Sequence, residues 1–250
     1  VSPSDVDAAI CDDTILITIM HANNEVGTIE PLREIAELTK QRKVRFHSDG
    51  AQSVGKLPTR MDELGVDLFS IAGHKLYAPK GVGALYIRRG TELAKLLHGA
   101  NHEQNRRAGT ENVLEIVGLG VAAELAHDGL ESFAATMKNT RDRLEKTLAA
   151  AIPDIVVNGH PTVRLPNTAN LSFPGLKANE LLDALPEIAA SPGAACHSEG
   201  VSISQVLLAM GVPEQVAMGA VRFSTGRDTT EKDIDHAAAS IIAAVERLRA

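Results

Sequence analysis

The stretch DLFSIAGHKLYAPKGVGALYIR, residues 67–88, decides the fold class. Residues 67–72 and 84–88 are short apolar runs of the kind that form strands, and a loop rich in glycine, with two lysines and a proline, joins them. Upstream, TILITIM (14–20) and VRFHS (44–48) predict two more strands, separated by a helix at residues 32–42. Alternating strands and helices are typical of right-handed crossovers, so this half predicts an α/β fold with a mostly parallel sheet and flanking helices.

The remaining segments extend this organisation. The continuous apolar run at 14–20 predicts a strand that is buried on both faces. The chain enters this strand after one short helix at 4–10, so we expect it to lack an N-terminal portion of the domain. Later segments predict helices at 113–127, 130–151, 178–185, 203–210 and 231–249, and strands at 154–158, 169–173, 187–191 and 221–225. We expect residues 1–125 to form part of a large α/β domain, and residues 126–250 a connecting helix and a smaller α+β domain.

Composition and charge narrow the functional classes. The formal net charge of -7 and the sequence pI near 5.7 argue against a protein that mainly binds nucleic acid or anionic membranes. No apolar run is long enough for a membrane helix. Two cysteines, Cys11 and Cys196, are too few for a disulfide framework and lack zinc-ligand spacing, and the histidines show no metal spacing either, so we expect no metal and a reducing cytoplasm. We expect Cys11 to be an inert buried cysteine.

Lys75 and Asp49 are the first candidates for chemistry. Each follows or ends a predicted strand, so both should lie at the carboxyl edge of the sheet, where ligands bind in α/β folds. Alone, Lys75 reads as a surface lysine, and the two residues could form a simple ion pair. They are also the groups that pyridoxal phosphate requires, since a lysine carries that cofactor and an acid holds a proton on its pyridine nitrogen.

Three further residues could act on a substrate. Asn24 follows the strand at 14–20 and could donate a hydrogen bond at the same edge, although Asn-rich turns often bond their own backbone. Cys196 lies among small residues beside His197 and could be a nucleophile, although a lone cysteine is more often inert and buried. Arg222 could grip a carboxylate, although a structural salt bridge is the commoner role of a single arginine.

The order of six motifs resembles one known family. The motifs NNExG (23–27), HxDxAQSxGK (47–56), GHKxYxPKGxGAL (73–85), RxGTEN (107–112), GAACHS (193–198) and RFSxGRxTT (222–230) resemble the class V aminotransferase-like group of pyridoxal-phosphate enzymes, fold type I. Within that group they resemble the cysteine desulfurases and selenocysteine lyases. The resemblance runs from about Thr14 to the end of the chain, and family members usually carry over a hundred further residues at the N-terminus.

The resemblance implies specific roles. Lys75 would carry pyridoxal 5'-phosphate, Asp49 would pair with its ring nitrogen, and Asn24 and Gln52 would contact its phenolate oxygen. The phosphate would be held by His74 and, from the other subunit of a homodimer, by Thr110. In this scheme Cys196 would take sulfur from L-cysteine as a persulfide, and Arg222, with Asn24, would bind the substrate. One departure is Ala72, where many desulfurases have a serine that adds a phosphate donor.

The resemblance leaves the substrate and the acceptor open. The AACHS stretch looks more like selenocysteine lyases, whereas the 26 residues from Cys196 to Arg222 match desulfurases of the iron–sulfur type. We favour cysteine desulfurase, with selenocysteine as a possible second substrate. The sulfur acceptor could be an iron–sulfur scaffold protein, a tRNA-thiolation relay or a selenium pathway. The alternatives are a truncated, inactive fragment that only folds or dimerises, and an aminotransferase, against which Cys196 argues.

Overall fold

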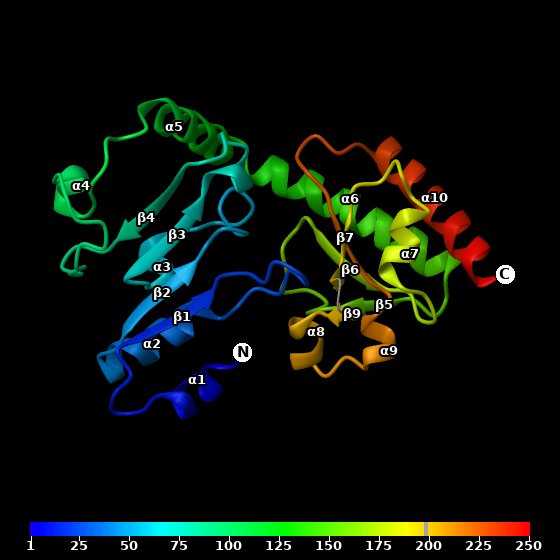
Figure 1. Cartoon of the computed structure of the whole chain (residues 1–250), viewed down its shortest axis with the longest axis horizontal. Helices are drawn as coiled ribbons and strands as arrows, with labels where there is room; N and C mark the ends of the chain where they lie inside the picture. Colours follow the sequence, from blue (N-terminus) through cyan, green and yellow to red (C-terminus); the bar gives the residue numbers. More distant parts are fainter. Residues whose placement is uncertain (198–199) are drawn as a thin grey trace. The chain divides into compact units, whose positions relative to one another are not determined.

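The computed structural model describes the backbone of residues 1–197 and 200–250 and the side chains of residues 1–193 and 203–250. The chain forms two compact units (Figure 1). Unit 1 comprises Val1–Ala22 and Glu30–Leu130, and unit 2 comprises Asn23–Ile29 and Glu131–Ala250. The chain therefore passes from one unit to the other three times, because the short segment Asn23–Ile29 belongs to unit 2 although both of its flanks belong to unit 1.

Unit 1 is built on a four-stranded sheet in the order β1-β2-β3-β4. Its strands are β1 (Leu16–Met20), β2 (Arg45–Asp49), β3 (Leu68–Ala72) and β4 (Gly83–Ile87). The first three are parallel, and β4 pairs antiparallel with β3. The expected α/β architecture with a mostly parallel sheet is confirmed. Because β1, β2 and β3 are parallel, their carboxyl ends lie at one edge of the sheet.

One face of this sheet is covered by helices. The helices α1 (Pro3–Ala9), α2 (Leu32–Arg42) and α3 (Met61–Leu64) connect or precede the parallel strands. Leu32, Ile35 and Ala36 of α2 recur at helical spacing and pack against Phe46 and Phe69 of the sheet.

The expectation that the strand at 14–20 is buried on both faces is wrong. Exposed and half-buried residues alternate along β1. Ile17 and Ile19 pack against the core of unit 1, whereas Leu16 and Met20 are 47% and 37% exposed. Within the described residues, only one face of β1 is covered, so the continuous apolar run does not correspond to two buried faces.

Two further helices complete unit 1. They are α4 (His102–Asn105), which contains three consecutive residues with positive φ, and α5 (Val113–Asp128). Although α5 is mostly apolar, several of its apolar side chains are exposed, with Leu114 at 81% and Val117 at 60%. A mostly apolar helix is normally buried, so α5 leaves an unusually apolar surface on unit 1.

Unit 2 is built on an antiparallel sheet in the order β5-β6-β10-β7. Its strands are β5 (Val156–Asn158), β6 (Thr168–Ser172), β10 (Ala220–Ser224) and β7 (Ser191–Pro192). The helices α6 (Leu130–Ala151), α7 (Ala178–Asp183) and α10 (Glu231–Arg249) pack on it and share one core cluster with β6 and β10. Thr230 and Asp233 form a capping box at the start of α10.

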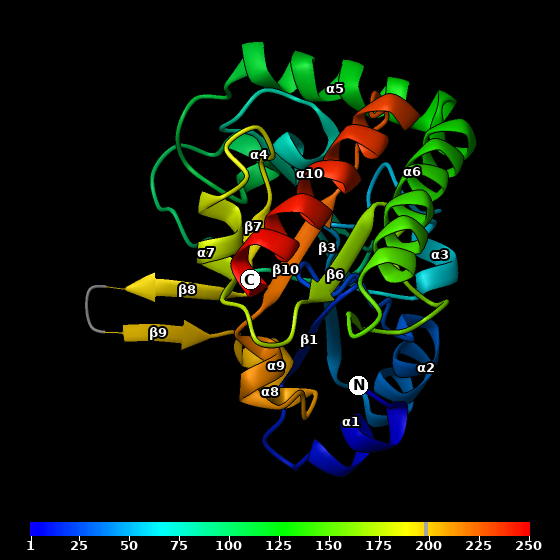
Figure 2. The same cartoon turned by 90° about the vertical axis from the view of Figure 1, so that its right-hand side faces the viewer.

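A hairpin follows β7 in unit 2. It consists of β8 (Ala194–His197) and β9 (Gly200–Ile203), which pair antiparallel, and is followed by α8 (Gln205–Ala209) and α9 (Glu214–Ala217). Figure 2 shows the hairpin extending away from the sheet of unit 2. The strand expected at 187–191 is mostly wrong, because residues 187–190 have no regular structure and β7 begins only at Ser191.

Candidate active site

The carboxyl edge of the unit 1 sheet carries two of the predicted residues, Asp49 and Lys75. Asp49 is the last residue of β2, and Lys75 lies in the 3₁₀ helix η1 (Gly73–Leu76), directly after β3. His21, which follows β1, donates its backbone N–H to the carbonyl of Asp49 at 2.8 Å. The sequence prediction that the ends of these three strands share one edge is therefore confirmed.

Asp49 presents a partly unpaired carboxylate. Its side chain is exposed, and Oδ1 accepts the backbone N–H of Ala51 at 2.8 Å. Oδ2 has no hydrogen-bond partner among the backbone groups and side chains that the structure describes. This single contact fixes the orientation of the carboxylate at the strand end and leaves one oxygen available to a ligand.

Lys56 lies beneath Lys75 and was not predicted from the sequence. Its side chain is buried, and Nζ donates to the carbonyl of Gln52 at 3.0 Å and to that of Lys75 at 3.5 Å. Burial, together with the smaller effect of the nearby charge of Lys75, lowers the pKa of Lys56 to about 8. No carboxylate in the described part of the chain forms an ion pair with Lys56. The loop after β2 and the loop after β3 thus share a buried amine.

His21 is a second buried group at this edge. Its Nδ1 hydrogen-bonds Ser53 Oγ at 2.9 Å, and its ring meets Phe69 edge-on. Burial lowers the pKa of His21 to about 4, so the ring is neutral near neutral pH. His21 therefore links the end of β1 to the loop that follows Asp49.

The other predicted residues of unit 1 are less constrained. His74 and Thr110 are exposed, and Gln52 is half-buried. Thr110 makes no hydrogen bond to another candidate residue in the described ranges, whereas its neighbour Glu111 binds His102 Nδ1 at 2.8 Å. The roles of His74, Thr110 and Gln52 stay predictions.

A second group of predicted residues lies within unit 2. Arg222 of β10 donates from Nη1 to the carbonyl of Asn24 at 2.7 Å and from Nη2 to Ser191 Oγ at 2.9 Å. Its Nε is buried, and no hydrogen-bond partner for it is found among the described residues. A buried donor without an acceptor is unfavourable, and a carboxylate would satisfy it. The structural salt bridge that is the usual role of a lone arginine is not formed by Arg222 in the described residues.

The structure describes the side chain of Cys11 but only the backbone of Cys196. Cys196 lies in β8, and its backbone pairs with Val201, but its side chain lies outside the described part of the chain. Its predicted catalytic role is therefore not tested by geometry. Cys11 is exposed, so the expectation that it is buried is wrong. It stands in the turn between α1 and β1, where Thr14 Oγ1 accepts its backbone N–H at 3.0 Å.

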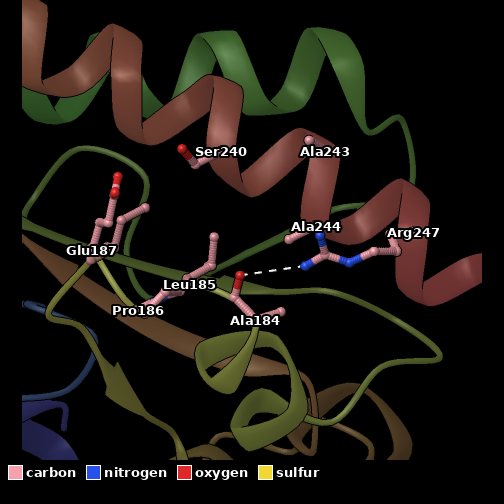
Figure 3. Close-up of a pocket in the computed structure, with 9 residues that line it drawn as sticks. Ala184, Leu185, Pro186, Glu187, Ser240, Ala243, Ala244 and Arg247 are labelled. Atoms are coloured by element: carbon pink, nitrogen blue, oxygen red, sulfur yellow. Dashed lines mark hydrogen bonds between the residues drawn. The ribbon is translucent and has the colours of Figure 1, made fainter.

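A pocket lies elsewhere in unit 2, between the end of α7 and α10 (Figure 3). Its volume is about 260 Å³, and its wall is largely apolar, with Glu187, Ser240 and Arg247 at its edges. Arg247 Nη2 reaches the carbonyl of Ala184 at 3.5 Å. None of the predicted site residues lines this pocket, so it is separate from the candidate groups above.

Two classes of feature are not found in the described residues. No group of three or more His, Cys, Asp or Glu side chains is arranged to hold a metal ion. Within the same residues, every helix is too short or too polar to cross a membrane.

Comparison with known proteins gives a consistent result. The Aminotransferase class-V family model matches residues 1–236. The chain is 44% identical to "Cysteine desulfurase IscS" of Dictyoglomus turgidum, over 100% of this chain and 64% of that protein. It is 48% identical to "Cysteine desulfurase" of Nostoc sp., over 98% of this chain and 62% of that protein. The chain thus spans less than two thirds of the length of these relatives.

Solved structures agree with the sequence relatives. A NifS-like protein from Rickettsia africae is 31% identical, with a TM-score of 0.87 over 100% of this chain and 66% of that chain. A second NifS-like protein is 34% identical, with a TM-score of 0.89 over 100% of this chain and 65% of that chain.

Proposed function

The chain belongs to the aminotransferase class-V family, and on that premise we propose that the whole protein is a pyridoxal 5'-phosphate-dependent cysteine desulfurase. The observation that supports the proposal is the position of Asp49 and Lys75 at the carboxyl ends of two neighbouring strands, with the buried Lys56 amine donating to the Lys75 carbonyl. The relatives named as cysteine desulfurases, at 44% to 48% identity, support the same reaction.

The residues at this edge fit the cofactor by their chemistry. Pyridoxal phosphate offers an aldehyde, a protonated ring nitrogen, a phenolate and a phosphate. Lys75 supplies an exposed amine for the aldehyde, and Asp49 Oδ2 supplies an unpaired acceptor for the ring N–H. Lys56 is a buried amine without an anionic partner in the described residues, so an anionic group nearby would be favourable. We assign Gln52 and His74 to the same cofactor as hydrogen-bond donors.

Pyridoxal phosphate supplies an electron sink when it is bound. The side chains of the protein supply the covalent attachment, the proton transfer and the contact with the ring nitrogen. Lys75 would hold the cofactor through Nζ, and once the substrate's amine has displaced it, the free Nζ would accept the proton from the substrate's α-carbon and return a proton to the substrate. Asp49, whose carboxylate is oriented at the strand end by the Ala51 N–H, would accept a hydrogen bond from the protonated ring nitrogen and so stabilise that proton.

We assign the substrate contacts to unit 2. The unpartnered Nε of Arg222 suits the carboxylate of L-cysteine, and Asn24, whose carbonyl Arg222 already holds, adds a polar side chain beside it. The Sγ of Cys196 attacks the sulfur of the substrate, so a sulfur–sulfur bond forms as the carbon–sulfur bond breaks. L-cysteine and the Cys196 thiol thereby give alanine and a Cys196 persulfide.

The proposal extends to partners and setting. Thr110 is assigned to the phosphate of a second subunit, which makes the working form a homodimer. The persulfide passes its outer sulfur to a thiol of an acceptor protein, so that the sulfur–sulfur bond to Cys196 breaks, a new one forms on the acceptor, and Cys196 returns to the thiol, which must stay unoxidised for the next turnover. A reducing compartment such as the cytoplasm satisfies that requirement.

The first experiment locates the cofactor. Pyridoxal phosphate is added to the purified protein, the visible spectrum is recorded, and borohydride reduction is followed by peptide mapping. We expect a yellow species and a label on Lys75, and neither in Lys75→Ala. Lys80→Ala is the matched control, because Lys80 is an exposed lysine of the same loop and should leave colour and label unchanged.

The second experiment tests the reaction. Alanine and sulfide are measured after addition of L-cysteine and a thiol reductant. We expect Cys196→Ser to abolish both products while retaining the yellow species, and Cys11→Ser to change neither. A label on a lysine other than Lys75 would refute the cofactor assignment. Undiminished alanine formation by Cys196→Ser would remove Cys196 from the mechanism, and a colourless, inactive protein would favour the fragment that only folds or dimerises.

A further inference from the structure

The segment Asn23–Ile29 is held in unit 2 by two facing strand residues. Asn170 of β6 and Arg222 of β10 are register partners in the antiparallel sheet. Asn170 Nδ2 donates to the carbonyl of Glu25 at 3.2 Å, and Arg222 Nη1 donates to the carbonyl of Asn24 at 2.7 Å. Asn170 is fully buried and is itself oriented by Asn158 Nδ2 at 2.8 Å. The backbone of Glu25 is therefore fixed beside Arg222 by buried hydrogen bonds.

The side chain of Glu25 reaches a different element. Its Oε2 accepts the hydroxyl hydrogen of Ser204 Oγ. Ser204 directly follows β9 and is the N-cap of α8, where its Oγ also accepts the N–H of Leu207 at 3.2 Å. The hydroxyl uses its single donor on the carboxylate and accepts from a helix N–H, and these two contacts together orient Ser204.

Ser204 is one of the two ends of the β8–β9 hairpin. Its backbone N–H donates at 2.8 Å to the carbonyl of Gly193, the residue that precedes β8. Gly193 in turn donates to the carbonyl of Ala220 at 2.6 Å, and a Cβ on Gly193 would lie 2.8 Å from the Cβ of Ala220. The base of the hairpin is thus pressed closely against β10.

Apolar packing joins the same parts. Val26, next to Glu25, shares a buried cluster with Leu207, Ala217 and Ala220. The strands of the hairpin extend away from the sheet (Figure 2), so the direction of the hairpin is set chiefly where its two ends are fixed. Cys196 lies on that hairpin, four residues before Gly200, the first residue of β9.

We propose that Glu25 is a positioning residue that fixes the base of the Cys196 hairpin, through Ser204, relative to Arg222. The catalytic meaning of this positioning role rests on the proposed function. L-cysteine is a small molecule whose carboxylate and sulfur are a few bonds apart, so the group that binds the carboxylate and the thiol that attacks the sulfur must keep a set relation. One short segment, Asn24-Glu25, contacts both Arg222 and the end of the hairpin.

The test uses Glu25→Ala in the purified protein, with two readouts that do not require turnover. One is amide hydrogen exchange in peptides that cover residues 191–204. The other is the rate of Cys196 alkylation by iodoacetamide, measured against Cys11, whose exposed thiol is an internal reference. Glu25→Ala removes the hydrogen bond between Ser204 and the Glu25 carboxylate. We expect the rate of amide exchange in these peptides and the rate of Cys196 alkylation to change by about tenfold. Glu25→Gln keeps an acceptor for Ser204 and should restore both.

Two further variants control for poor folding of Glu25→Ala and for a non-specific effect of removing a carboxylate. Ser204→Asp keeps an oxygen that caps α8 but cannot donate to Glu25, so it should reproduce Glu25→Ala even if Glu25→Ala folds poorly. Glu180→Ala, which removes an exposed carboxylate of the same unit, should change neither readout. In the active enzyme we expect kcat to fall in Glu25→Ala while KM and the cofactor spectrum hold.

The outcomes separate this inference from the proposed function. Faster exchange and altered Cys196 alkylation, restored in Glu25→Gln, would support the positioning role even if the protein had no desulfurase activity. Unchanged exchange and alkylation in both Glu25→Ala and Ser204→Asp would overturn it, even if desulfurase activity were established.

Discussion

Acidification should weaken unit 1 through His21. Burial lowers the pKa of His21 to about 4, whereas an unfolded chain has a histidine pKa near 6.5. Between these values the unfolded state binds the proton and the folded state does not. The stability contributed by neutral His21 is therefore complete above about pH 6.5 and is lost as the pH falls toward 4.

The size of the effect follows from the shift. Each unit of pH below the unfolded pKa costs about 1.4 kcal/mol, so the free energy of unfolding should fall by about 2 kcal/mol near pH 5. The pKa of His47 is also lowered by burial, an effect opposed by Asp49, so His47 adds a contribution of the same sign. The comparison between wild type and His21→Asn isolates the part that belongs to His21.

The assay is urea unfolding followed by tyrosine fluorescence. The protein has no Trp, and its two tyrosines, Tyr77 and Tyr86, both lie in unit 1, so the signal reports on the unit that contains His21. His98→Asn is the matched control, because His98 is an exposed histidine of the same unit. We expect wild type and His98→Asn to lose stability together and His21→Asn to lose about 2 kcal/mol less. Equal losses in all three proteins would refute the reasoning.

Three further predictions follow from single contacts. Gly50→Ala places a Cβ 2.0 Å from the ring of Phe69 and should destabilise unit 1 by about 1–3 kcal/mol in urea unfolding, with recovery in Gly50→Ala/Phe69→Leu. Glu145→Ala leaves the buried Arg164 without its bidentate partner and should lower the free energy of unfolding by about 3–5 kcal/mol, against less than about 1 kcal/mol for exposed Arg143→Ala. Lys56→Met removes the amine shared by two loops and should speed amide exchange at residues 73–78 about fivefold, and unchanged exchange would contradict its bridging role.

Much of the fold could be predicted because its elements have strong local signals. The helix at 32–42 matches α2, since its apolar residues recur on one face and Lys43 ends it with a left-handed φ of 57°. The prediction of a strand at 187–191 was wrong because it rested on the composition of the segment, whereas residues 187–190 form no regular secondary structure. The hairpin β8–β9 was missed, since small residues and glycines suggest a turn and do not reveal which segments pair.

The candidate site divides in the same way. Lys75 and Asp49 could be predicted to share an edge, because parallel strands bring the residues at their carboxyl ends together. The buried position of Lys56 could not, since lysine normally signals a solvated surface and its burial depends on two loops closing over it. Glu25 was likewise missed, because its partner Ser204 is distant in sequence and no local pattern links them.

The passage of Asn23–Ile29 through unit 2 bears on how the protein can be divided. The boundary between residues 130 and 131 is an obvious place to divide the chain. Division there would, however, take the segment Asn23–Ile29 away from the C-terminal piece. That segment accepts hydrogen bonds from Asn170 and Arg222, and its Val26 is part of a buried apolar cluster of unit 2. The two units are therefore not independent modules. A chimaera joined at residue 130 would combine the C-terminal part of unit 2 with a segment Asn23–Ile29 from another protein. During synthesis this segment emerges long before β6, which holds the carbonyl of Glu25, and longer still before β10, which supplies Arg222, so its contacts in unit 2 form late.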